Sequence, residues 1–187
     1  MEGKMKNIFL IILISFFTFT IISCAKESGS SSSSASTIST PPIADGTYKL
    51  TATTHKVYYS NGTLYGSYTY EISHDSSVTP GYLALGMEWK GSGVYRITSK
   101  GKATLSASGL DDTTIDCTTN EIDDVTLDTD GFVTNETAIQ TGCGGGSSSI
   151  TTVSQKFTVF PGGFQAYIVL KDSDSNQFQI TYTFQKQ

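Results

Sequence analysis

The sequence predicts an all-β protein built from about ten antiparallel strands. After residue 43, apolar and polar residues alternate along several segments, which is the period of a strand with one buried face. Short turn sequences separate these segments, and none of them keeps a helical apolar period over three turns. Such a meander fits an up-and-down barrel or a sandwich of two packed sheets.

The alternation is clearest in three segments, and in each of them one face is apolar. Thr, Val, Ile, Tyr and Phe are the common residues there, as half-buried pleated surfaces favour. The residues expected on the buried faces are Tyr48, Leu50 and Ala52 in the first segment, Leu83, Leu85, Met87 and Trp89 in the second, and Phe178, Ile180, Tyr182 and Phe184 in the third.

Turn sequences divide the chain at regular intervals. Asn61-Gly62 has the strongest short-range signal for a hairpin, because both residues tolerate the backbone of a tight turn. Gly, Pro, Asp and Asn mark the other turns for similar reasons. These turns are expected at 90–93, 99–102, 129–131, 161–163 and 172–176.

The N-terminus has the parts of an export signal. A short basic head precedes a fifteen-residue, mostly apolar run, Ile8 to Ile22. That run is shorter than the roughly twenty apolar residues of a membrane-spanning helix, and no basic cluster follows it. An ordinary secretory signal would place a small residue three positions before a cut at Cys24, where Ile21 stands. Ordinary secretion and a retained membrane anchor are the alternatives to the interpretation that follows.

Ile21, Ile22 and Ser23, directly before Cys24, resemble the lipobox of bacterial lipoproteins. The resemblance implies cleavage before Cys24 and acyl chains on its thiol and amine, which together anchor the chain to a membrane. Ala25 follows, and not the Asp that retains lipoproteins in the inner membrane under the best-known sorting rule. The resemblance therefore implies the bacterial cell envelope, with the outer membrane favoured over the inner.

The chain divides into three parts on this interpretation. Residues 1–23 are the signal peptide, and residues 24–43 are a Ser-rich, lipidated tether that contains nothing able to form a core. Residues 44–187 are long enough for a single β domain. Without the signal peptide the chain has 10 basic and 16 acidic residues. This acidic balance argues against a nucleic-acid partner, which requires a basic patch.

Export determines the expected state of the cysteines. With Cys24 assigned to lipid, Cys117 and Cys143 are the remaining pair, and an oxidising compartment favours a disulfide between them. Closing a loop of this length contributes roughly 3–4 kcal/mol on the loop-entropy model. Two unpaired thiols or a metal site are the alternatives.

Gly46-Thr47-Tyr48 at the start of the domain resembles the opening of bacterial lipocalin-like domains, in which a Gly-x-Trp begins the first strand. Here Tyr48 stands in place of the Trp. The resemblance implies an aromatic ring that closes one end of a barrel. For this reason a lipocalin-like barrel is favoured over a two-sheet sandwich.

No catalytic residue is identified. His55 and His74 are the only histidines, and both are expected on the surface. No Gly-x-Ser-x-Gly sequence exposes a serine nucleophile. Phosphate-loop, zinc and dinucleotide motifs are also missing from the sequence, so we expect a non-enzyme without a cofactor. A hydrolase is a minor alternative.

Calcium is considered because the segment from Asp111 to Glu136 is rich in carboxylates and lacks Lys and Arg. Two short sequences have ligand spacing, but both fail to match a complete calcium loop, and turns with the same residues are more common. We expect no metal, and we name the weak calcium candidates as Asp128, Asp130, Asp172, Asp174 and Asn176.

Tyrosines crowd one predicted hairpin and form the best candidate binding surface: Tyr58, Tyr59, Tyr65, Tyr68 and Tyr70. The face with Tyr68 and Tyr70 is expected in the core, and the face with Tyr65 outside. Exposed aromatic rings can form hot spots for a partner. The sequence therefore predicts a lipid-anchored binding protein, with a protein or glycan on this surface or a small apolar ligand in a barrel. A structural or surface-coat lipoprotein without a ligand is the alternative.

Overall fold

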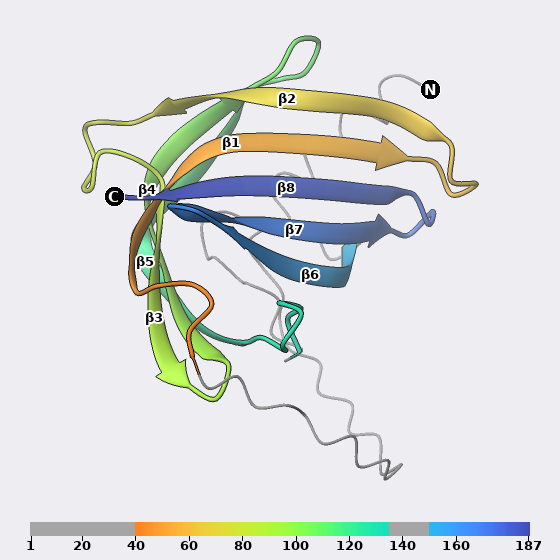
Figure 1. Cartoon of the computed structure of the whole chain (residues 1–187). Coiled ribbons are helices and arrows are strands. Elements are labelled where there is room, and N and C mark those ends of the chain that lie inside the picture. The colour runs from red at the N-terminus through yellow and green to blue at the C-terminus, as the bar shows by residue number, and fades with distance from the viewer. Residues whose placement is uncertain (1–39, 135–149) are drawn as a thin grey trace, which may run out of the picture.

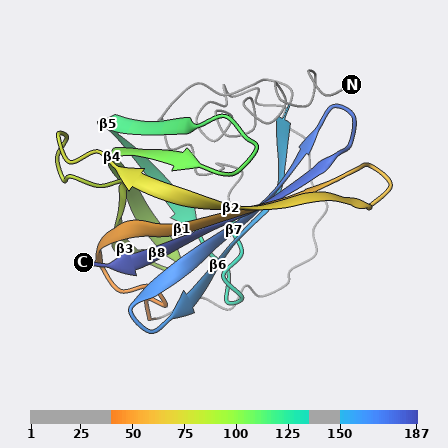
Figure 2. The ribbon, with the colours of Figure 1, turned by 90° about the horizontal axis from the view of Figure 1, so that it is seen from above.

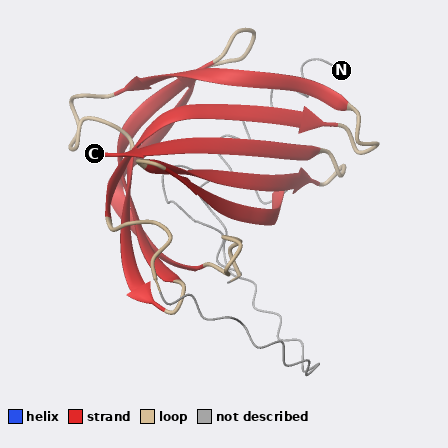
Figure 3. Cartoon of the chain, in the orientation of Figure 1, coloured by secondary structure: helices blue, strands red, loops and turns tan. Residues whose placement is uncertain are grey.

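The computed structural model describes residues 40–134 and 150–187, without the side chains of residues 118–123. All regular structure in this part is β-strand (Figure 3). Every pairing between strands is antiparallel, so the predicted all-β antiparallel class is confirmed. The strands are β1 (Gly46–Tyr58), β2 (Leu64–His74), β3 (Ala84–Gly91), β4 (Val94–Ser106), β5 (Thr113–Thr126), β6 (Ile150–Phe160), β7 (Gly163–Asp172) and β8 (Gln177–Lys186).

The strands form one continuous sheet that curls into a partial ring. Their order is β2-β4-β3-β1-β8-β7-β6, with β5 paired to β4 and an additional pairing between β2 and β1. In Figure 1, β2, β1, β8, β7 and β6 lie side by side in one curved layer, and β3, β4 and β5 cross its left end steeply. Figure 2 shows the same fan of strands from above. Within the described residues β5 and β6 do not pair with each other, and isolated bridges Leu127–Val133 and Phe132–Lys156 are the contacts across this side of the ring.

A change of partners along β1 produces the bend in this sheet. The first residues of β1, Gly46–Lys49, pair with β3, whereas Thr53–Tyr58 pair with β2. β4 changes partners in the same way, from β3 to β2. The four strands therefore enclose a corner, and the concave side of the sheet receives the apolar faces that the alternation predicts.

Two predictions about these strands are wrong, and a β-bulge is the reason in both cases. The turn expected at 99–102 is the middle of β4, where the register shifts between Ser99 and Gly101. Gly101 has φ +88° there, and a Cβ atom would lie 2.0 Å from the backbone oxygen of Tyr82, so glycine is required without a reversal of the chain. This merger, together with the absence of a regular strand after the turn at 129–131, leaves eight named strands in the described residues where about ten were expected.

The second bulge lies in β1. The register against β8 shifts between Leu50 and Ala52, which moves the buried positions from even to odd residues. Ala52 is half-buried, whereas Thr53, His55 and Val57 are buried. A shift of one residue turns every later side chain to the opposite face of a strand. Polar residues thereby enter the core, although Ala52 was expected there.

The predicted hairpins are otherwise confirmed. Turns join β1 to β2 at Asn61-Gly62, β3 to β4 at Gly91–Gly93, β6 to β7 at Pro161-Gly162 and β7 to β8 at 173–176. The turn at 129–131 is also present, but the segment after it makes only isolated bridges and no strand. In the part of the chain that the structure describes, no helix is long and apolar enough to span a bilayer.

The core fills the concave side of the sheet with aromatic and branched residues. Tyr48, the ring expected at one end, is buried and lies edge-on to Phe164, with 5.0 Å between the ring centroids. Packing begins at Ile43, one residue before the expected domain start. Its side chain is 1 % exposed, and Tyr95 Oη accepts its N–H (2.8 Å) and donates to its carbonyl oxygen (2.9 Å). Burial raises the pKa of Tyr95 to about 12, so the hydroxyl stays protonated as this donor.

Candidate binding surfaces

The hairpin between β1 and β2 carries an exposed aromatic patch. Tyr59 and Tyr65 are each 41 % exposed and Leu64 is 50 % exposed, so all three present apolar surface to solvent. The two tyrosine rings contact each other edge to face, with centroids 5.3 Å apart. We call these three residues the hairpin patch. Figure 1 shows the hairpin at the end of the upper layer, away from β3, β4 and β5.

Local hydrogen bonds fix the backbone that carries the hairpin patch. Tyr59 donates its N–H to the Thr63 carbonyl (2.9 Å), and Gly62 donates to the Tyr59 carbonyl (2.8 Å). Asn61 accepts the N–H of Thr63 through Oδ1 (2.9 Å), as an Asx turn does. Ser60 donates its N–H to Oδ1 of Asn176 (3.2 Å), which joins this hairpin to the β7–β8 turn. The patch therefore stands on an ordered turn.

The other tyrosines of the candidate surface divide between core and rim as their alternation predicts. Tyr70 is 6 % exposed, and Tyr68 is half-buried against the core. Burial raises the pKa of Tyr70, and the neighbouring Tyr68 raises it further. Tyr68 lies over Gly66, where a Cβ atom would meet the Tyr68 hydroxyl at 2.6 Å. Tyr58 is half-buried, so Tyr59 and Tyr65 are the exposed members of the five.

The expectation of two surface histidines is wrong. His74 at the end of β2 is half-buried, and both ring nitrogens bond to backbone: Leu83 donates its N–H to Nδ1 (3.2 Å), and Nε2 lies 3.0 Å from the Leu50 carbonyl. This arrangement assigns the ring proton to Nε2 and requires a neutral ring. Burial lowers the pKa of His74, as does the charge of Lys49, against the opposing hydrogen bond to Leu50. His74 therefore holds the β2–β3 loop to β1.

His55 lies in the core because of the bulge in β1. Its ring is 2 % exposed and packs against Tyr70 of β2, with centroids 4.7 Å apart, and against Tyr182 of β8, with centroids 6.4 Å apart. Burial lowers its pKa to about 3, which keeps the imidazole neutral at physiological pH. The hydrogen bonds of His74 thus go to backbone groups.

The weak calcium candidates form turns. Asp128 Oδ1 accepts the N–H groups of Asp130 (2.9 Å) and Phe132 (2.8 Å). Asp172 Oδ1 does the same for Asp174 (3.0 Å) and Asn176 (2.8 Å). These bonds account for the Asp-x-Asp spacing without a cation. No group of three or more His, Cys, Asp or Glu that could hold a metal occurs within residues 40–134 and 150–187.

Part of the acidic segment is neutralised by β4. Arg96 forms a two-pronged contact with Asp124 on β5, at 3.0 and 3.2 Å, and Lys102 lies 3.2 Å from Asp116. Each pair occupies directly opposed positions of the two strands. Arg96 lowers the pKa of Asp124 through this hydrogen bond. Cross-strand ion pairing therefore reduces the repulsion between the crowded carboxylates.

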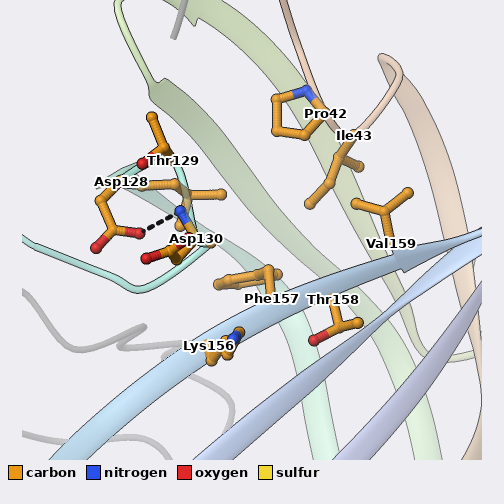
Figure 4. Close-up of a pocket in the computed structure, with 11 residues that line it drawn as sticks. Pro42, Ile43, Asp128, Thr129, Asp130, Lys156, Phe157, Thr158 and Val159 are labelled. Carbon is orange, nitrogen blue, oxygen red and sulfur yellow. Dashed lines mark hydrogen bonds between the residues drawn. The ribbon is translucent and has the colours of Figure 1, made fainter. Parts of the chain in front are cut away.

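A pocket of about 290 Å³ opens beside the turn that contains Asp128 and Asp130. Three separate segments line it, namely 42–43 before β1, 127–131 after β5 and 156–159 in β6. Figure 4 shows the two aspartates on one side, Ile43 and Val159 on the other, and Phe157 between them. The alternation could not identify this pocket, because its residues come from three segments, of which the first and the last lie more than a hundred residues apart in the chain.

The remaining site predictions concern residues that the structure does not cover. Cys24 and Cys143 lie outside the described part, so lipidation and the disulfide stay predictions. Cys117 is buried on β5, opposite Gly101 of β4. Comparison of the chain with protein-family models, curated proteins and solved structures finds no match.

Proposed function

We propose that this chain is a non-catalytic binding protein of the bacterial envelope, anchored by lipid at Cys24, which engages a protein partner through the hairpin patch. The anchor is inferred from the lipobox-like sequence before Cys24. The serine-rich segment after it separates the β domain from the membrane surface.

One observation gives the binding role its strongest support. The two tyrosine rings of the hairpin patch remain exposed although they contact each other, and Leu64 extends the apolar surface beside them. Tyrosine is enriched among interface hot spots, because it offers a large, rigid area with a polar tip at low entropic cost. An ordered turn beneath the patch reduces that cost further.

The anchor is tested on the native protein. Mass spectrometry of the N-terminal peptide from membranes should show cleavage before Cys24 and the added mass of acyl chains. An uncleaved leader, or an unmodified thiol at the new N-terminus, would exclude the anchor. The β fold would be unaffected by that outcome.

The partner is tested by photo-crosslinking in cells that express the full chain. A photoreactive amino acid at position 64 should give a discrete crosslinked protein band. Replacing Tyr59 and Tyr65 by Ser in the same chain should remove this band. Val153 on β6 is 53 % exposed and lies outside the patch, so the same crosslinker at position 153 is the matched control. Identical bands from positions 64 and 153 would refute the hairpin patch as a binding surface.

A further inference from the structure

The pocket beside β6 has an apolar floor. Phe157 and Ile43 are almost fully buried beneath it, whereas Val159 is 46 % exposed although it lines the pocket. A volume of about 290 Å³ is near the lower end of ordinary ligand pockets. The floor can therefore accept the apolar body of a small molecule, and Val159 would lose its exposed surface when such a molecule binds.

The acidic and basic side chains that line the pocket lie in different places. Asp128 and Asp130 lie together on the turn that forms one side of it (Figure 4). Two backbone N–H groups hold the carboxylate of Asp128 in place. Lys156 also lines the pocket, but its ammonium lies 4.5 Å from the ring centroid of Phe132, which is not a lining residue. The ammonium keeps its charge but contacts an aromatic ring. With one cation and two carboxylates, the charged side chains that line the pocket have a net charge of −1, and both carboxylates are on the turn.

We propose that this pocket binds a small organic cation with an apolar body, such as a primary amine attached to an aromatic ring. The apolar body would cover Phe157 and Val159, and the ammonium would lie beside Asp128 and Asp130. An anion would meet the two carboxylates, and the net charge of −5 opposes it further. A bare metal ion is a poorer fit, because hard cations take several oxygen ligands and the described residues hold no group of three or more His, Cys, Asp or Glu that could bind one. This inference is independent of the hairpin patch.

A matched series of probes tests the proposal on the full-length, processed chain in nanodiscs. Phenethylamine, phenethyl alcohol and phenylacetate share one apolar body and differ in charge. Backbone NMR shifts at Gly131 and Thr158 report on the pocket, and empty nanodiscs correct for partitioning into lipid. Phenethylamine should shift both signals at the lowest concentration, the alcohol should need more, and phenylacetate should need the most.

Two variants separate charge from apolar contact. Asp130→Asn should weaken phenethylamine binding about two- to fivefold, as expected for an exposed ion pair, and leave the alcohol unchanged. Val159→Thr should weaken the amine and the alcohol alike. Asp174→Asn is the control for the first variant, because Asp174 occupies the equivalent place in the other Asp-x-Asp turn but lies outside the pocket. Val153→Thr is the control for the second.

Three results would overturn the proposal. One is equal binding of the three probes, since the carboxylates would then contribute nothing. Another is an identical effect of Asp130→Asn and Asp174→Asn on phenethylamine. The third is saturation with phenethylamine without a shift at Gly131 or Thr158, which would place any binding elsewhere. All four substitutions are at exposed side chains, so loss of the fold would not obscure the comparison.

Discussion

Acid should destabilise this protein through His55, and the effect has a defined sign. Burial lowers the folded-state pKa of His55 to about 3 from an ordinary value of 6.5. At pH above 6.5 the ring is neutral in both states and its titration contributes nothing to stability. As the pH falls below 6.5, the unfolded chain binds a proton that the folded chain does not. The free energy of unfolding therefore falls until the pH reaches the folded-state pKa.

The size of the effect follows from the width of that window. Each pH unit within it costs about 1.4 kcal/mol, so His55 alone removes about 2 kcal/mol between pH 6.5 and pH 5. This is a large share of the roughly 5–15 kcal/mol that stabilises a typical domain. In urea, 2 kcal/mol corresponds to a shift of about 1 M in the unfolding midpoint.

The assay is urea unfolding of the chain from residue 25 onward, at pH values from 7 to 4. Trp89, the single tryptophan, is half-buried, lies edge-on to the core residue Tyr95 and reports unfolding by fluorescence. A His55→Gln variant cannot titrate at this position, so its midpoint should fall less steeply with acid. His74 contributes with the same sign, since its pKa is also lowered, but it is present in both proteins. Equal slopes for the parent and the variant between pH 6.5 and 4.5 would refute the buried, neutral His55.

Three further predictions follow from the packing. Tyr95→Phe removes the hydroxyl that bonds both backbone groups of the segment before β1, so it should cost about 2–3 kcal/mol, measured by urea unfolding; an unchanged midpoint would contradict these bonds. Gly101→Ala should cost about 3 kcal/mol or more, whereas Gly109→Ala should cost only about 1 kcal/mol, because both have positive φ but only the first meets a backbone oxygen; equal midpoints would argue against the bulge. Alkylation of the denatured, non-reduced protein followed by mass spectrometry should find Cys117 and Cys143 linked, and two alkylated thiols would exclude the disulfide.

Period-two alternation predicted the strands well because burial on one face is a local property. The segment from Phe178 to Phe184 keeps its predicted face throughout β8, and the Asn61-Gly62 turn joins β1 to β2 as expected. In these segments the residue types suit both the buried and exposed faces of the strand and the turn that follows it. Local preference and tertiary packing point to the same structure in such segments.

Period-two alternation could not predict the bulges. Gly101 has a positive φ in a bulge, and a turn of the kind expected there would use the same property of glycine. The two outcomes differ only in whether β4 continues to pair with β5, a contact that depends on residues further along the chain. The bulge after Leu50 acts similarly, since it places His55 inside although its neighbours in sequence are polar.

The candidate binding surfaces also combine features that the sequence could predict with features that it could not. Exposure of Tyr65 could be predicted, because it shares the outer face of β2 with Ser67, Thr69 and Glu71. Its contact with Tyr59 required the geometry of the hairpin. The pocket could not be predicted at all, because no property of Ile43 or Val159 in the sequence indicates that they lie near Asp130.

The hairpin patch and the pocket can be tested independently because they lie apart on the sheet. Figures 1 and 2 both place the β1–β2 hairpin at one end of the upper layer and the turn after β5 away from it. Substitutions at separate sites without shared partners usually have additive effects. A combined Tyr65→Ser, Asp130→Asn chain should therefore lose crosslinking as the first change does and amine binding as the second does. Coupling between the two losses would mean that one surface controls the other through the curved sheet, and both proposals would then need a common two-state element.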